Sequence, residues 1–113
     1  MPAMPDATTP DPEDLKLVTL ARSARARSGA AEGAAVRDDI GRTYAASTVD
    51  LPSLRLTAVQ AAVAAAVSSG SDRLEAVAVV GETSVLSDAD AAVLTDVAVT
   101  TVLRADPDGT LRA

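Results

Sequence analysis

The chain contains no cysteine and no histidine among its 113 residues. Disulfides, iron–sulfur clusters, ordinary zinc sites, thiol nucleophiles and Ser–His–Asp triads all need a thiol or an imidazole, so the sequence excludes them. Aromatic residues are almost missing as well, since there is no Phe, no Trp and a single Tyr, Tyr44. Stacking platforms for single-stranded nucleic acid are therefore excluded too.

Basic residues are scarce relative to acidic ones. The chain has 10 Lys and Arg against 16 Asp and Glu, which gives a formal net charge of −6. Residues 1–14 hold four of these acids and no base, so the rest of the chain is nearly balanced. Because binding to a phosphate backbone depends on a basic surface, nucleic acid is not an expected partner.

Long hydrophobic runs are absent. The longest apolar stretch, Ala58–Val67, is interrupted by Gln60, whereas a membrane span needs about 20 residues. The N-terminus is acidic and rich in proline, unlike a secretory signal. We therefore expect a cytoplasmic protein with no membrane partner, and the Ala, Val, Asp and Arg bias with one Lys is typical of a GC-rich bacterial genome.

The chain has the length of one domain. Residues 1–12 hold four of the six prolines and show no periodicity, so we predict a disordered acidic tail followed by a domain over 13–113. Asp11 and Pro12 are typical of a helix start, and Gly29 of a helix end. A first helix is predicted over 13–28.

Further along, apolar periodicity and turn residues alternate. Pro52-Ser53 opens a segment that is apolar nearly all round as far as Ser69, which indicates a helix in the centre of the domain. The order α-β-β-α-β-α-β-β predicts a mixed sheet in a three-layer α/β/α domain. The other predicted elements are strands 33–37, 42–47, 74–80, 97–104 and 110–112 and a short helix 88–94.

The order and spacing of these elements resemble the cytidine deaminase family over roughly residues 15–111. The matching segments are Gly33–Ala35, Gly41–Tyr44, Leu56–Ala62 with Gly70, Leu74–Val80 and Val102–Gly109. The resemblance implies a cytidine-deaminase-like α/β/α fold.

In that family three Cys or His/Cys ligands hold a zinc ion that activates water, and a glutamate shuttles the proton. The resemblance places the three ligand positions at Thr57, Ser87 and Asp90, and the glutamate position at Val59. Hydroxyls and one carboxylate cannot replace thiolates for zinc, and valine cannot transfer a proton. We therefore predict no catalytic residue, no metal and no cofactor.

The positions that contact the sugar of the nucleoside in that family fall near Thr48 and Asp50, and no aromatic remains to stack on the base. A vestigial nucleoside pocket would then be lined by Thr48, Asp50, Thr57, Gln60 and Ser87.

These observations predict a non-catalytic member of the family, a pseudoenzyme that acts as an interaction or regulatory module with a protein partner. Two alternatives stay open. One is a nucleoside-binding protein that keeps the old pocket, and the other is a working hydrolytic deaminase of cytidine or deoxycytidine. The resemblance also implies a homodimer or homotetramer.

Several polar motifs have a structural interpretation that we favour. Ser87 with Asp88 and Asp90 is typical of a helix cap with first-turn acids rather than a magnesium site. The segment 106–109 indicates a turn rather than a calcium loop, and Asp38-Asp39 a hairpin turn rather than a ligand pair.

Three arginines, Arg22, Arg25 and Arg27, complement the dipole at the end of the first helix, although binding of phosphate or RNA is an alternative. Thr57 and Gln60 lie on an apolar helix, and we expect them to hydrogen-bond to backbone groups rather than to a ligand.

Overall fold

The computed structural model describes residues 11–83 and 85–112. Most of the tail predicted over 1–12 lies outside these residues. No helix within them is long and apolar enough to cross a membrane. The elements are α1 Pro12–Ser28, β1 Glu32–Asp38, β2 Thr43–Ser47, β3 Val49–Leu51, β4 Leu54–Leu56, α2 Ala58–Ser68, β5 Leu74–Gly81, α3 Asp88–Asp96 and β6 Thr101–Ala105.

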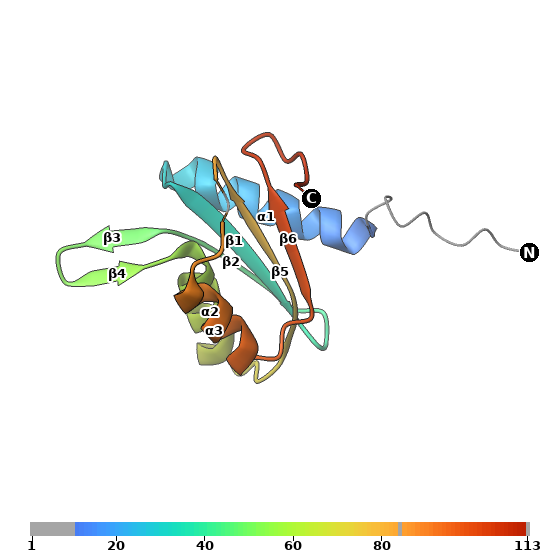
Figure 1. The fold of residues 1–113 in the computed structure, drawn as a ribbon. Coiled ribbons are helices and arrows are strands. Elements are labelled where there is room, and N and C mark those ends of the chain that lie inside the picture. The colour runs from blue at the N-terminus through green and yellow to red at the C-terminus, as the bar shows by residue number, and fades with distance from the viewer. Residues whose placement is uncertain (1–10, 84, 113) are drawn as a thin grey trace, which may run out of the picture.

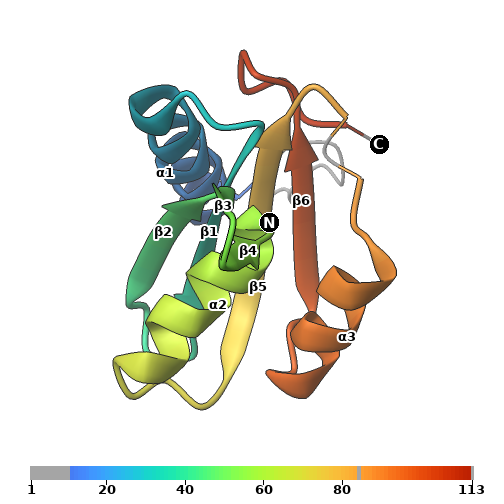
Figure 2. The same ribbon diagram turned by 90° about the vertical axis from the view of Figure 1, so that its left-hand side faces the viewer.

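The main sheet has four strands in the order β2-β1-β5-β6. β1 pairs antiparallel with both β2 and β5, and β5 pairs parallel with β6, so the sheet is mixed as predicted. α1 covers one face of the sheet, while α2 and α3 cover the other (Figure 1, Figure 2). The three-layer α/β/α architecture is therefore confirmed.

α1 begins and ends where the sequence predicts. The Asp11 side chain accepts a hydrogen bond from the Glu13 backbone N–H at 2.7 Å, and Pro12 occupies the first turn. Gly29 takes the left-handed conformation at φ 66°, and its N–H donates to the Arg25 carbonyl at 2.9 Å. These caps satisfy backbone groups that a helix end leaves free.

β5 separates two cores. Its side chains alternate, so Val77 and Val79 face the core under α2 and α3, while Ala76, Ala78 and Val80 face the core under α1. All but one of its residues are buried. This explains the nearly continuous apolar run, which is typical of a strand covered on both faces.

α1 packs closely on β1 because Gly33 has no side chain. A Cβ atom at this position would lie 2.1 Å from the Ala21 carbonyl oxygen and 2.8 Å from the Arg25 backbone nitrogen. Backbone atoms cannot give way at such distances, so the glycine sets the spacing between this helix and the sheet.

The long central helix predicted from Pro52-Ser53 is wrong at its start. α2 begins at Ala58, and the residues before it form the hairpin of β3 and β4 with Pro52-Ser53 as the turn. The Thr57 cap explains the boundary, because its side chain accepts from the free N–H of Gln60 in the first turn of the helix. Because residues 54–67 are apolar nearly throughout, their pattern does not distinguish β4 from the helix that follows it.

The burial predicted for α2 is also wrong on one side. Ala58, Val59, Ala62 and Ala66 are buried against the sheet, whereas Val67 near the C-terminal end is half exposed. α2 therefore packs through one face.

The C-terminal strands are shorter than predicted. Val97 ends α3, and β6 begins only at Thr101. The last predicted strand is reduced to one bridge between Ala105 and Leu111. The turn predicted at 106–109 is present, since the Gly109 N–H donates to the Asp106 carbonyl at 2.8 Å.

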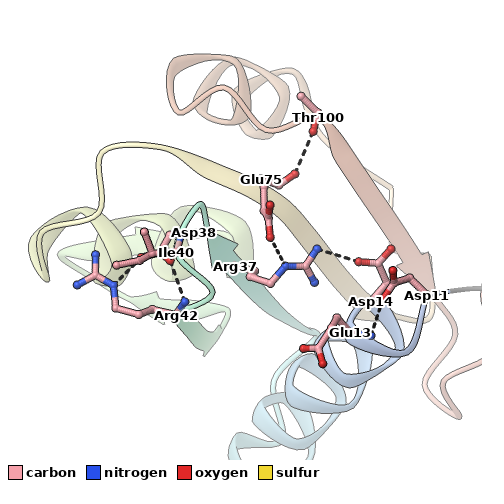
Figure 3. Close-up of polar contacts among 9 residues, drawn as sticks. All are labelled: Asp11, Glu13, Asp14, Arg37, Asp38, Ile40, Arg42, Glu75 and Thr100. Carbon is pink, nitrogen blue, oxygen red and sulfur yellow. Dashed lines mark hydrogen bonds and ion pairs between the residues drawn. The ribbon is translucent and has the colours of Figure 1, made fainter.

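Asp38 lies fully buried at the end of β1, where the chain turns toward β2 (Figure 3). Its carboxylate accepts hydrogen bonds from Ser71 Oγ and Arg42 Nε, both at 2.7 Å, and from the backbone N–H groups of Arg42 at 2.8 Å and Ile40 at 3.1 Å. Burial alone would raise the pKa of Asp38, but these bonds outweigh it and lower the pKa to about 2. Asp38 therefore stabilises the turn between β1 and β2, in agreement with the hairpin turn predicted at Asp38-Asp39.

Arg37 ties three elements together beside this turn (Figure 3). From β1 its guanidinium donates to Asp14 of α1 at 3.0 Å and to Glu75 of β5 at 2.5 Å. The acidic first turn of α1 is thus bound to the sheet.

Candidate functional site

The candidate site lies at the end of the sheet opposite the Asp38 turn, where α2 and α3 begin. The start of α2 is a capping box. Thr57 Oγ1 accepts from the Gln60 N–H at 3.0 Å, and Gln60 Oε1 accepts from the Thr57 N–H at 2.9 Å. Both residues therefore bond to backbone groups, as expected for polar residues on an apolar helix.

The start of α3 lies against the start of α2. Ser87 caps α3, and its Oγ accepts from the Asp90 N–H at 3.1 Å. The Thr57 hydroxyl donates to Asp90 Oδ1 at 2.6 Å, although the two residues lie far apart in sequence. The structure thus brings together the three positions at which the resemblance places metal ligands, with Asp90 only 3% exposed.

Val59 lies apart from this polar cluster. It is 1% exposed, and its side chain belongs to the apolar core between α2 and the sheet. The valine carries no titratable group, and its neighbours in the core are apolar.

A cavity of about 440 Å³ opens beside Thr57. Its walls come from the end of α1, the start of β1, the residue after β2, the start of α2 and the loop after β5. The lining residues are Arg25, Ala31, Glu32, Thr48, Thr57, Glu82, Thr83 and Val85.

Glu32 is the partly buried carboxylate of this cavity. Burial raises the pKa of Glu32, and the negative charge of Asp90 raises it further. Its backbone N–H donates to Thr48 Oγ1 at 3.2 Å, which fixes the start of β1 next to Thr48. Acidic groups with perturbed pKa values in a cleft are common at functional sites.

A second cavity of about 260 Å³ lies at the base of the β3–β4 hairpin and shares Thr48 and Thr57 with the first. Asp50 and Gln60 line this second cavity. Asp50 is strongly exposed and pairs with Arg55 at 3.5 Å. The five residues predicted to line a vestigial pocket are therefore divided: Thr48, Asp50, Thr57 and Gln60 line cavities, and Ser87 caps α3.

Two residues of this site, Glu32 and Arg112, are not among those predicted from the sequence. Arg112 donates from its guanidinium to the carbonyl groups of Glu82 and Thr83 and to the Asp106 carboxylate. It thereby holds the loop that walls the larger cavity. A basic residue near the end of a chain carries no sequence signal for such a contact.

The arginines at the end of α1 bind backbone carbonyls. Arg22 Nε donates to the Pro107 carbonyl at 3.0 Å, and Arg25 Nε donates to the Ala31 carbonyl at 3.1 Å. Arg27 is exposed in the last turn. Arg22 and Arg25 thus have a structural role, although through carbonyls outside the helix rather than through the helix dipole, and only Arg25 and Arg27 lie in the last turn.

The residues present do not fit the zinc ion that the resemblance implies. The chain has no Cys or His, and zinc is held in proteins by thiolate, imidazole and carboxylate groups. Within residues 11–83 and 85–112, no three Asp or Glu side chains are grouped to hold a metal. The Thr57 hydroxyl instead donates a hydrogen bond to the Asp90 carboxylate.

Comparisons with known proteins agree with this fold. Residues 10–109 match the protein family described as "Cytidine deaminase-like". The structure is similar to the crystal structure of a cytidine deaminase from Burkholderia pseudomallei, with a TM-score of 0.75 and 26% identity over 86% of this chain and 87% of that one. A search of curated proteins gave no significant match.

The family match spans all six strands and three helices of the structure described above. The chain belongs to the cytidine deaminase-like family.

Proposed function

We propose that this protein is a non-catalytic member of its family that acts through contacts with protein. The observation that carries the proposal is the valine at the proton-transfer position, buried at 1% exposure in the apolar core. Hydrolytic deamination in the family needs an activated water and a proton carrier. Val59 supplies no proton transfer, and Thr57, Ser87 and Asp90 do not fit zinc.

The β3–β4 hairpin supports a function in protein contacts. It projects from the body of the molecule (Figure 1), and its register places Val49 opposite Leu56 and Leu51 opposite Leu54. These four side chains share one face because strand residues alternate. Leu51 is 54% and Leu54 49% exposed.

A two-stranded hairpin is marginally stable alone in water, and an exposed aliphatic face favours association. We propose that this face takes part in self-association, as a homodimer or homotetramer, or binds a protein partner.

The larger cavity favours a second candidate function, binding of a nucleoside without chemistry. Its volume of about 440 Å³ is within the range of small-molecule sites. Glu32 offers a carboxylate to a polar ligand. The Thr48 and Thr57 hydroxyls donate their protons to the Glu32 carbonyl and to Asp90, so each offers a ligand only a remaining acceptor lone pair.

The first test is turnover of cytidine and deoxycytidine by the zinc-supplemented protein, followed through loss of the cytosine absorbance. We expect a rate equal to that of buffer with zinc. Turnover that survives repeated purification and disappears in Glu32→Gln would contradict the proposal, because it would identify Glu32 as a replacement proton carrier.

The second test compares oligomeric state by light scattering over a range of concentrations. Leu54→Asp should shift the protein toward the monomer, whereas Ile40→Asp, in the exposed turn at the opposite end, should not. A wild-type protein that remains monomeric throughout would contradict self-association.

Ligand binding is tested by thermal shift with cytidine. A rise in Tm that Glu32→Gln removes and Asp50→Ala preserves would assign the larger cavity, and the reverse pattern would assign the smaller one. A flat response would contradict nucleoside binding.

A further inference from the structure

We propose that the position of the family's metal centre has become a metal-free clasp, in which Thr57 of α2 and Asp90 of α3 join the starts of the two helices. The clasp rests on the proposed function in one respect, the absence of a bound metal. It is independent of the proposed protein contacts.

The Thr57 hydroxyl is fully used as a donor. Its single proton goes to Asp90 Oδ1 at 2.6 Å, a short distance typical of a hydroxyl bound to a carboxylate. The same oxygen accepts from the Gln60 N–H at 3.0 Å. The hydroxyl therefore links the backbone at the start of α2 to a side chain of α3.

Asp90 links the backbone at the start of α3 to the Thr57 side chain. Its backbone N–H donates to Ser87 Oγ at 3.1 Å, so it sits in the first turn of α3, where the helix dipole favours a negative charge. The residue is only 3% exposed. Because a buried carboxylate without hydrogen bonds is strongly unfavourable, the bond from Thr57 offsets a cost that water cannot.

The clasp also accounts for how α3 is held. α3 buries only Asp90 and Leu94 along its length. Leu94 packs into the core that α2 covers, and Asp90 fixes the other end of the helix. Val93 and Val97 add apolar contacts with this core at the C-terminal end, and Leu86 adds one just before the helix. Asp90 is the polar contact of the first turn, so its loss should loosen the start of α3.

A double-mutant cycle of Thr57→Val and Asp90→Ala, followed by thermal unfolding, measures the coupling directly. We expect Thr57→Val to lower Tm by about 5–10 °C and Thr57→Ser to restore most of the loss. In the double variant the Tm loss should be clearly smaller than the sum of the two single losses. Additive losses would overturn the clasp, because Thr57 would then act only as a cap for α2.

Thr95→Val is the matched control. Thr95 is an exposed residue of α3 whose hydroxyl donates to the Ala91 carbonyl of the same helix at 3.0 Å. The Thr95→Val variant loses a hydroxyl that makes no contact between helices, so its Tm should differ from that of the wild type by no more than about 2 °C. A loss as large as that of Thr57→Val would contradict the clasp.

Metal addition gives a readout unrelated to activity. Zinc or a chelator should leave the Tm of the wild-type protein unchanged, whereas a Thr57→Cys, Ser87→Cys, Asp90→Cys variant should gain a zinc-dependent rise in Tm and the absorption of cobalt thiolates. A zinc-dependent rise in the wild type, or no metal response in the folded triple variant, would overturn the proposal. Turnover of cytidine with coupling intact would contradict the proposed function and leave the clasp standing.

Discussion

Two buried aspartates lie at opposite ends of the sheet, and their surroundings differ. Asp38 binds the Arg42 guanidinium, the Ser71 hydroxyl and two backbone N–H groups. Asp90 binds the Thr57 hydroxyl, and its negative charge raises the pKa of Glu32. A cation thus offsets the first charge, while a second acid adds to the other.

Asp38 is a folding anchor, whereas Asp90 bonds to Thr57, which lines the larger cavity. Charge is compensated where it only closes a turn, and its compensation is weaker where the cavity opens. Burial raises the pKa of Glu32 and the charge of Asp90 raises it further, so the ionised carboxylate is a destabilising cost at that end of the sheet. Costs of this kind are often found at functional sites.

The largest expected effect breaks the compensated end. Asp38→Asn removes the charge that Arg42 binds and leaves a neutral amide facing the Ser71 hydroxyl and two N–H donors. We expect Tm to fall by about 10 °C, since the buried carboxylate of Asp38 loses its charge and the donors around it lose their acceptor.

Asp39→Asn is the control for this substitution, because Asp39 is an exposed residue of the same turn. It should change Tm by about 2 °C or less. Equal losses in the two variants would mean that the turn sequence matters, not the buried carboxylate.

Acid pH should sharpen the same contrast. The pKa of Asp38 is about 2 in the folded protein, below the ordinary value of 3.8, so its stabilisation is complete above about pH 4 and is lost as the pH falls toward 2. The Tm difference between wild type and Asp38→Asn should therefore shrink across this window. A difference that stays constant from pH 7 to pH 2 would contradict the assigned ion pair.

Several of the helices and strands that position the two aspartates could be predicted from the sequence. Asp11, Pro12 and Gly29 predict α1, and the apolar run of β5 predicts a strand covered on both faces. The mirrored pattern Val-Asp-Leu and Leu-Arg-Leu around Pro52-Ser53 could have revealed the β3–β4 hairpin. It was hidden because the alanine-rich helix follows it without a polar break.

The contacts at the two ends could be predicted only in part. The resemblance placed Thr57 and Asp90 at related positions, and both residues lie at the start of a helix. The hydrogen bond between them, and the approach of Glu32, depend on packing between distant segments. Local sequence does not encode such distances.

The smallest expected effect on Tm comes from removing the charge of Glu32 at the end of the sheet where Asp90 lies. The pKa of Glu32 is raised by burial and by Asp90, so the folded protein bears a cost once the pH rises through that pKa, and no cost below the ordinary value of 4.5. Glu32→Gln should raise Tm by about 2 °C at pH 7 and leave it unchanged at pH 4. Glu82→Gln, an exposed acid of the same cavity, serves as the control and should leave Tm unchanged at both pH values.

Part of this gain should disappear when Glu32→Gln is made in an Asp90→Asn background, because Asp90 supplies part of the repulsion. A fall in Tm at pH 7 would reverse the interpretation. Glu32 would then be a carboxylate held in place by favourable contacts, and both ends of the sheet would be folding anchors of the same kind.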